Sequence, residues 1–407
     1  MLSLKSLFQR QPEPLIGLDI SATAVKLVEL ARHGQDGWTL ERCTMVPLPP
    51  GCIVDGSIAN MDEVSATIHR LLAKSGTRTK NVALALPASA VITKKVILPG
   101  ALSDQEMEIQ VESEASQYLP FALEEVRLDF CVIGPNAKNP GDVDVLLAAT
   151  RKEKAHERQD AAEIAGLKPT VLDIESYAAL LAVQRVLDHP QAPAHVGEAD
   201  LAVLINVGDR GYTMQVLRGE EILFDHEQGM GGAQLTQAIA RYYSITPEEA
   251  EQKKRNDNLP DDYATAVLAP FVKNLALDIG RSLQFFFTST PYHSVQHILL
   301  FGGSAILEGL ASAIQNETKV STLVLDPFLG MEMGSSINKS KIRKAAPAYL
   351  TACGLALRRF YQCFSSISYR TEKSQTNAAK KFFKWQCSAP CLPVCWQRRL
   401  YFLSTKP

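Results

Sequence analysis

Two polar turns, each lying between apolar strands, carry the residues of this sequence whose types and spacing suggest chemistry. The first, residues 19–23, has Asp19 followed by small residues, and the second, residues 206–213, has Asn206 followed by glycines. Backbone N–H groups in glycine-rich and small-residue turns form concave anion sites. If the two turns face one another, they can hold a chain of phosphate groups between them.

The two turns lie at matching places in two similar stretches of sequence. When Asp19 is aligned with Asn206, Lys26 falls opposite Thr213, and apolar strands precede and follow both turns. An internal duplication is the simplest explanation, and repeats are sought before other features because they decide the fold. The sequence therefore predicts an α/β protein built from two similar halves.

Two further glycine-rich segments follow in the second half. Residues 229–232 precede a predicted helix, and residues 302–304 follow a short apolar strand. A lone Gly-Gly pair is usually only a turn. Four glycine or small-residue turns in this order favour a nucleotide site, because only glycine lets the backbone approach a base or a pyrophosphate closely.

Regular elements that could position these turns follow from hydrophobic periodicity and from capping signals. In the first half we predict strands at 15–20, 24–30, 38–48, 82–87 and 169–173, with helices near 60–76, 152–165 and 176–187. In the second half we predict strands at 201–206, 212–217, 221–226 and 297–301, with helices at 234–243, 247–254, 261–288, 306–314 and 344–359. A kink at Pro270 is expected within the longest helix.

Residues 88–150 have a different texture and interrupt the first half. They contain predicted strands at 91–98, 127–133 and 143–148, and a helix at 104–118 opened by a capping box. We therefore predict an inserted small α+β subdomain. The predicted division is an N-terminal segment (1–13), a first domain (14–87 with 151–190), the insertion (88–150), a second domain (191–360) and a basic tail (361–407).

The charge distribution sets the C-terminal tail apart from the rest of the chain. The whole chain of 407 residues has 42 basic and 44 acidic residues, so nothing global favours nucleic acid. Residues 361–407 have a net charge of +7 and half of the eight cysteines, but their cysteine spacing is not typical of zinc. An unstructured tail, a membrane-binding segment such as 380–385 and a shifted reading frame stay open as interpretations.

Membrane-spanning segments are not expected. No run of 18 apolar residues occurs, and the N-terminus lacks the apolar segment of a signal peptide. Leu2, Leu4, Leu7 and Phe8 could touch a membrane surface, or the start of the chain could simply be frayed. The scattered cysteines of the body are typical of reduced thiols in a cytosolic protein.

The motifs together resemble the actin-like ATPase superfamily, which includes sugar kinases, Hsp70 chaperones and FtsA. Leu18-Asp-Ile-Ser21 resembles its first phosphate motif, Asn206-Val-Gly208 the second, and Leu299-Leu-Phe-Gly-Gly303 its adenosine motif. Across about residues 14–360 the chain more closely resembles the PilM family of type IV pilus assembly proteins, as in Tyr118-Leu-Pro-Phe121 and Ala352-Cys-Gly-Leu-Ala356. The resemblance implies a duplicated actin-like (ribonuclease H-like) fold with an FtsA-like inserted subdomain.

By this resemblance the cofactors are ATP and Mg²⁺. Asp19 is the expected metal-associated acid, and Asp19 and Asn206 are the expected catalytic residues. The expected nucleotide-binding residues are Ser21, Ala22, Thr23, Lys26, Gly208, Asp209, Arg210, Thr213, Gly231, Gly232, Glu251, Lys254, Gly302, Gly303 and Ser304.

The second phosphate motif departs from the family pattern. Asn206 stands where an aspartate ordinarily orients Mg²⁺ and the attacking water, and asparagine is a poor base without negative charge. Asp209 and Arg210 replace small or hydroxyl residues in the same turn. We therefore expect nucleotide binding to be kept more readily than hydrolysis, with at most a weak ATPase activity.

The resemblance implies a cytoplasmic nucleotide-binding scaffold of the type IV pilus assembly machine, at the inner-membrane face. The expected partner is the N-terminal cytoplasmic segment of the inner-membrane protein PilN, through which the protein would be peripherally attached. Other inner-membrane components of the machine and self-association are further expectations, and no nucleic acid is expected. An FtsA-like filament-forming ATPase and a small-molecule kinase of the same superfamily are the alternatives.

Overall fold

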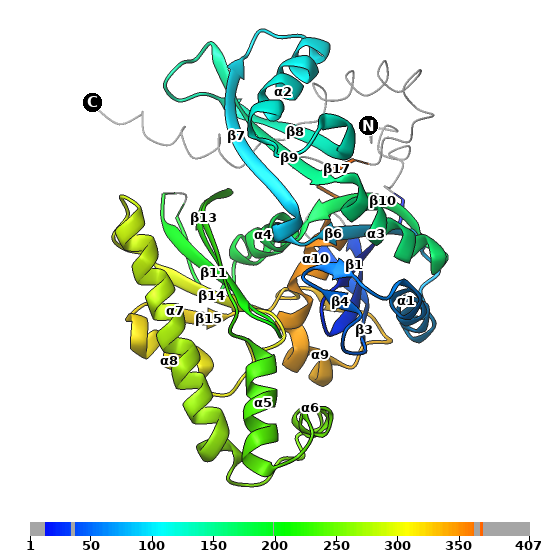
Figure 1. The fold of residues 1–407 in the computed structure, drawn as a ribbon, viewed down its shortest axis with the longest axis vertical. Coiled ribbons are helices and arrows are strands. Elements are labelled where there is room, and N and C mark those ends of the chain that lie inside the picture. Colours follow the sequence, from blue (N-terminus) through cyan, green and yellow to red (C-terminus); the bar gives the residue numbers. More distant parts are fainter. Residues whose placement is uncertain (1–12, 34–36, 198, 362–366, 369–407) are drawn as a thin grey trace, which may run out of the picture. The chain divides into compact units, whose positions relative to one another are not determined.

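The computed structural model describes residues 13–33, 37–197, 199–361 and 367–368. Its first sheet brings together strands from distant parts of the chain (Figure 1). In spatial order these are β16 (Glu332–Met333), β3 (Gly37–Pro47), β2 (Ala24–His33), β1 (Ile16–Ile20), β6 (Asn81–Leu86) and β10 (Lys168–Ile174). A short hairpin, β4 (Ile53–Val54) and β5 (Ser57–Ile58), follows β3 in the chain. A two-residue strand, β17 (Ile367–Ser368), is the last element described.

The second sheet repeats the order of the first. It runs β13 (Glu221–Gln228), β12 (Tyr212–Arg218), β11 (Leu201–Val207), β14 (His297–Phe301) and β15 (Ser321–Val324). In both sheets the first three strands in the chain are antiparallel and the next two are added in parallel. Asp19 pairs with Lys26 and Asn206 pairs with Thr213, so the predicted alignment of the two turns is confirmed.

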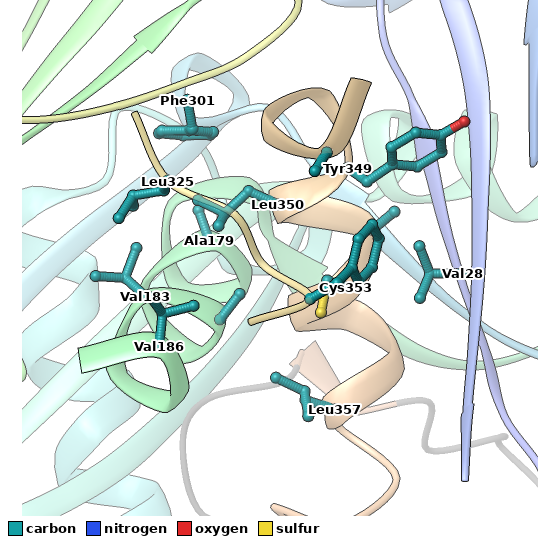
Figure 2. Packing of buried hydrophobic residues seen from close by; sticks show 14 of the residues in the cluster. Val28, Ala179, Val183, Val186, Phe301, Leu325, Tyr349, Leu350, Cys353 and Leu357 are labelled. Atoms are coloured by element: carbon teal, nitrogen blue, oxygen red, sulfur yellow. The ribbon is translucent and has the colours of Figure 1, made fainter. Parts of the chain in front are cut away.

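Helices cover both faces of the two sheets. The first sheet lies between α1 (Met61–Ser75) with α3 (Lys152–Ile164) and α4 (Glu175–Leu187) with α10 (Leu350–Leu357). The outer face of the second sheet packs on α5 (Gly232–Tyr243), α7 (Ala269–Ser289) and α8 (Leu310–Thr318). Its inner face shares one hydrophobic core with α4, α10 and the first sheet. Figure 2 shows this shared core, which contains Phe301, Val183 and Leu350 together with Val28 and Cys353.

The residues of the predicted insertion form a sheet of their own. A three-stranded sheet, β7 (Val91–Pro99), β9 (Asp142–Arg151) and β8 (Val126–Pro135), carries α2 (Asp104–Tyr118) on one face (Figure 1). The predicted capping box forms, since the Ser103 side chain accepts from the Glu106 backbone N–H and the Glu106 carboxylate accepts from the Ser103 N–H. Short 3₁₀ turns, η2 (Ala88–Ala90) and η3 (Leu123–Glu125), lead into β7 and β8.

Three helix boundaries differ from the prediction, and glycine or proline explains each. The helix predicted from 306 begins at Leu310, because Gly309 is left-handed with φ of 79°. The helix predicted at 344–359 is divided at Pro347 into α9 (Lys339–Ala345), the 3₁₀ turn η5 (Ala346–Tyr349) and α10. Where a kink at Pro270 was expected, a π-helical turn, η4 (Ala264–Leu268), directly precedes α7, and Pro270 lies in the first turn.

The predictions about 1–12 and about the tail beyond Tyr361 fall almost entirely outside the described residues. Tyr361 itself lies against Trp38 of β3, with the ring centroids 6.3 Å apart. Within the described ranges, the structure contains no helix long and apolar enough to cross a membrane.

Candidate functional site

The first predicted phosphate turn, residues 19–23, contains the end of β1 and the connection of residues 21–23 that joins β1 to β2. Asp19 is almost fully buried and forms an ion pair with Lys26, with 2.7 Å between Oδ2 and Nζ. Ser21 closes the turn, because its N–H and its hydroxyl both donate to the Ala24 carbonyl, at 3.0 and 2.8 Å. The turn is therefore pre-shaped, and the Asp19 carboxyl group lies against the Lys26 ammonium.

The second predicted phosphate turn is supported by two segments that were also predicted to bind nucleotide. The carbonyl of Gly208 accepts from Gly232 N–H, in the first turn of α5, and from the Ser304 hydroxyl, both at 3.0 Å. A Cβ added at Gly231 would lie 2.5 Å from the carbonyl oxygen of Asp209. Glycine is therefore required for the close approach of α5 to the turn.

The amide groups at the start of α5 already have acceptors within the protein. Gly232 N–H donates to Gly208, and Ala233 N–H donates to the Asp209 carbonyl at 2.8 Å. The Gln234 side chain accepts from Gly231 N–H. In this structure these groups hold the second turn in place rather than presenting open donors to an anion.

The predicted adenosine segment follows β14 and lies against Asn206. Gly302 has φ of 99°, and a Cβ added there would lie 2.4 Å from Asn206 Oδ1. A Cβ added at Gly303, in contrast, would meet no atom within 4 Å. Gly302 is thus a packing requirement, whereas Gly303 is the position where a ligand could lie against bare backbone.

The predicted acid and lysine of α6 (Pro247–Arg255) form a hydrogen-bonded network with α5. Lys254 Nζ donates to Thr236 Oγ1 at 2.6 Å and forms an ion pair with Glu251, and Thr236 Oγ1 donates to Glu251 Oε2 at 2.6 Å. Burial would raise the pKa of Glu251, but hydrogen bonds from Lys254, Thr236 and Arg255 lower it overall. Glu251 therefore stays ionised and fixes Lys254.

The structure thus gathers the predicted residues into two groups. One contains the first turn, with Ser21, Ala22, Thr23, Lys26 and Asp19. The other contains the second turn, the start of α5, the 302–304 segment and α6. Asn206 and Thr213 face each other across the β11–β12 ladder at the edge of this second group.

Glu175 connects the two groups, and sequence reasoning missed it. It is the first residue of α4, directly after β10, and it accepts a hydrogen bond from Asn206 Nδ2 at 3.4 Å. Burial and the charge of Asp19 raise its pKa from the ordinary 4.5 to about 7, against the opposing influence of Lys26 and Arg158. A usable signal was its position, because ligands of α/β sheets bind beyond the carboxyl ends of parallel strands.

Arg158 of α3 was also missed. Its guanidinium is buried and donates to the carbonyls of Ile20, at the end of β1, and Gly56, in the β4–β5 hairpin, at 3.0 and 2.8 Å. Burial lowers its pKa, while the charges of Glu175, Asp19 and Glu157 raise it. Arg158 therefore fixes the end of β1 where the first turn begins, and it partly neutralises the buried acids.

Asp19 and Glu175 could bind Mg²⁺ only together with water molecules and the phosphates of a nucleotide. Among the described residues no group of three or more histidines, cysteines or acids could hold a metal ion. Mg²⁺ commonly binds through one or two carboxylates, several waters and the phosphates of a substrate. Asp19 and Glu175 can supply those carboxylates, whereas Asn206 adds a neutral hydrogen-bonding group.

The raised pKa of Glu175 predicts a specific pH dependence of stability. The folded state holds the Glu175 proton more tightly than the unfolded state, so this residue favours folding below pH 4.5 and loses that contribution as the pH rises to about 7. The free energy of unfolding of Glu175→Gln minus that of the wild type should therefore be about 2 kcal/mol larger at pH 8 than at pH 5. Urea unfolding at both pH values measures this. Glu153→Gln, at an exposed position, is the control, and an equal difference at both pH values would contradict the assignment.

The duplicated strand order, the separate three-stranded sheet between β6 and β10 and the matching turns of the two halves define a protein of the actin-like ATPase fold. The family model of the type IV pilus assembly protein PilM matches residues 17–360, and the chain belongs to that family. A solved structure of the PilM-PilN type IV pilus biogenesis complex is 29% identical, with a TM-score of 0.71, covering 86% of this chain and 100% of that chain.

Two further solved structures are similar to this chain at lower levels. The ethanolamine utilization protein EutJ from Carboxydothermus hydrogenoformans is 15% identical, with a TM-score of 0.48, and the match covers 86% of this chain and 91% of that chain. MreB5 of Spiroplasma citri bound to ADP is 11% identical, with a TM-score of 0.44, and the match covers 86% of this chain and 97% of that chain.

Proposed function

We propose that this protein is a nucleotide-binding scaffold of the type IV pilus assembly machine, working at the cytoplasmic face of the inner membrane. The match to the PilM family over residues 17–360 carries the proposal. The proposed domains are those predicted from the sequence, with the insertion at 88–150 between the two parts of the first domain. ATP with Mg²⁺ would lie between the first turn and the cluster around the second.

Nucleotide binding is supported by the arrangement of groups around the two turns. Lys26, Lys254 and Arg210 supply cations on both sides, and Gly303 offers open backbone beside the second turn. Glu251 and Lys254, fixed by Thr236, would flank the adenosine. The site would hold the phosphates between the two halves, so bound nucleotide would stabilise one relative position of those halves.

Gly303→Ala should weaken Mg-ATP binding at least fivefold without destabilising the fold. Its added methyl group would project into open space, where the nucleotide is proposed to lie, and no protein atom would clash with it. Isothermal titration calorimetry on the full chain measures the affinity. Gly134→Ala, in β8, is a matched control because a Cβ there also meets no atom within 4 Å. An unchanged affinity for Gly303→Ala would contradict the adenosine assignment.

Docking of the N-terminal cytoplasmic segment of PilN is proposed by similarity to the PilM-PilN complex. The inserted subdomain is the proposed docking region, because β7, α2 and β8 carry exposed apolar side chains. These are Ile92, Ile97, Ile109, Tyr118, Val132 and Ile133. An extended peptide could place alternate side chains among them and use pockets for specificity.

Lys94→Glu should reduce binding of a PilN N-terminal peptide by tenfold or more and leave Mg-ATP binding unchanged. Lys94 is exposed on β7 and lies over the Tyr118 ring, so the reversal introduces a negative charge within the proposed docking region. Fluorescence anisotropy of a labelled peptide measures this, and Lys273→Glu on α7 is the control. Loss of both peptide and nucleotide binding would instead indicate misfolding.

Slow ATP hydrolysis is a second candidate activity, and Glu175 favours it. A carboxylate with a pKa of about 7 can accept a proton from an attacking water at neutral pH. Phosphate release measured with and without the PilN peptide tests this. Loss of turnover in Glu175→Gln is the expected result, whereas turnover that persists in this variant would exclude Glu175 as the base.

A further inference from the structure

Arg210 reaches from the second turn to the opposite half of the molecule. It lies between Asp209 and Gly211, yet its guanidinium Nη2 donates to the carbonyl oxygen of Ile53 in β4. Its Nη1 lies 3.9 Å from Oδ1 of Asp55, at the tip of the same hairpin. The turn predicted to bind phosphate is therefore directly bonded to the β4–β5 hairpin of the first half.

The β4–β5 hairpin is held on its other side by α3. The Lys154 ammonium donates to Ser57 Oγ at 2.6 Å, and the Glu157 carboxylate accepts from Ile58 N–H at 3.0 Å. Arg158 binds the Gly56 carbonyl of the hairpin and the Ile20 carbonyl at the end of β1. Arg158 thus links the hairpin to the strand end from which the first turn begins.

The bond from Arg210 to Ile53 can be replaced. Its acceptor is a neutral carbonyl. The Arg210 side chain is 47% exposed and the Asp55 side chain is 95% exposed. A phosphate oxygen is a stronger acceptor for guanidinium than a neutral carbonyl, and the planar guanidinium can bind two phosphate oxygens at once. An exposed pair with Asp55 contributes little to hold the side chain where it is.

We propose that Arg210 distinguishes nucleoside triphosphates from diphosphates. Its guanidinium exchanges the Ile53 carbonyl for the third (γ) phosphate, which only a triphosphate carries. This inference rests on the proposed nucleotide site and adds how the protein responds to the number of phosphates on the bound nucleotide. With ADP, Arg210 keeps its bond to Ile53 and the second turn stays tied to the hairpin. With ATP the guanidinium turns to the terminal phosphate and the hairpin is released on that side.

The test uses the full chain and the variants Arg210→Ala and Arg210→Lys. Arg241→Ala, an exposed arginine of α5, is the control. Calorimetry with Mg-ATP and Mg-ADP gives the two affinities, and hydrogen–deuterium exchange of a peptide covering residues 50–60 reports the hairpin. In the wild type, Mg-ATP should speed exchange in this peptide, and Mg-ADP should change it little.

Arg210→Ala should lose about tenfold in affinity for Mg-ATP and less than twofold for Mg-ADP. Its hairpin should exchange fast without nucleotide and show no further response to ATP. Arg210→Lys should restore part of the ATP affinity, because an ammonium binds phosphate as a point charge. The inference is overturned if Arg210→Ala keeps the wild-type ratio of the Mg-ATP and Mg-ADP affinities, or if Mg-ATP does not change hydrogen exchange in the wild-type hairpin. Neither result contradicts the proposed nucleotide site. Failure of the wild type to bind either nucleotide overturns both.

Discussion

Replacing Gly354 with alanine is expected to leave little folded protein. Gly354 lies where α10 crosses α4, and a Cβ added there would lie 1.7 Å from the Ala178 carbonyl oxygen, a backbone atom that no side-chain rotation can move away. Alanine has the higher helix propensity by about 1 kcal/mol, which alone would stabilise α10. The clash decides the sign, because α10 would have to move away from α4.

Movement of α10 has no free direction. On its other side the helix packs on β1, where a Cβ added at Gly17 would lie 2.1 Å from the Ala352 carbonyl oxygen. The surrounding core reaches both sheets (Figure 2). Overpacking of a core typically costs about 1–3 kcal/mol and sometimes more, and here we expect at least the upper value of about 3 kcal/mol. A domain with a total stability of about 5–15 kcal/mol would lose a large share of it.

Urea unfolding followed by circular dichroism measures the loss at Gly354. Gly280→Ala on α7 is the matched control, because its added Cβ would meet only the flexible Glu317 side chain, at 3.1 Å. We expect the midpoint of Gly280→Ala to stay near the wild type, while Gly354→Ala is insoluble or strongly shifted. A Gly354→Ala protein as stable as Gly280→Ala would show that α10 does not pack as described.

Removing the carboxylate of Asp173 is expected to have the second large effect. Asp173 has no exposed surface, and Arg358, at the end of α10, is 6% exposed and forms an ion pair with it. Burial raises the pKa of Asp173, and Arg358 lowers it. Breaking a buried ion pair from one side costs about 3–5 kcal/mol, because a charge is left buried without its counterpart. Asp173→Ala should therefore destabilise the protein by that amount.

The double variant Asp173→Leu with Arg358→Met separates the cost of the buried charge from the cost of lost packing. Replacing both members of a buried pair by apolar residues of similar volume is often neutral or stabilising. We therefore expect the double variant to regain most of the stability lost in Asp173→Ala, measured by the same urea titration. Equal losses in both would mean that packing around β10, rather than charge, explains the effect.

The parts of the site that the sequence predicted are those encoded locally. The pairing of Asp19 with Lys26 and of Asn206 with Thr213 follows from strand–turn–strand patterns of a dozen residues, so the duplication could be recognised. The capping box at Ser103 is equally local. Proline and glycine altered helix limits at Pro347 and Gly309 because a single residue can override a long apolar period.

The residues that connect the two halves could not be found in this way. Glu175 reaches Asn206 across 31 positions in the sequence, Arg158 reaches Ile20 across 138, and Arg210 reaches Ile53 across 157. Such pairs depend on how the sheets and α3 are placed, and no periodicity specifies them. Arg210 was predicted as a nucleotide-binding residue by resemblance, but its bond to the first half required the three-dimensional fold.

The position of α10 also affects how the chain can fold during synthesis. β1 starts at Ile16, whereas α10, which packs on it, ends at Leu357. Similarly, β3 pairs with β16, which lies at residues 332–333. At a ribosomal rate of about 5–20 residues per second, the first sheet waits on the order of 20–70 s for the helix that completes it. During that interval the face of the sheet around Gly17 and Val28 lacks its α10 cover, so this apolar face stays open on the nascent chain until α10 has emerged.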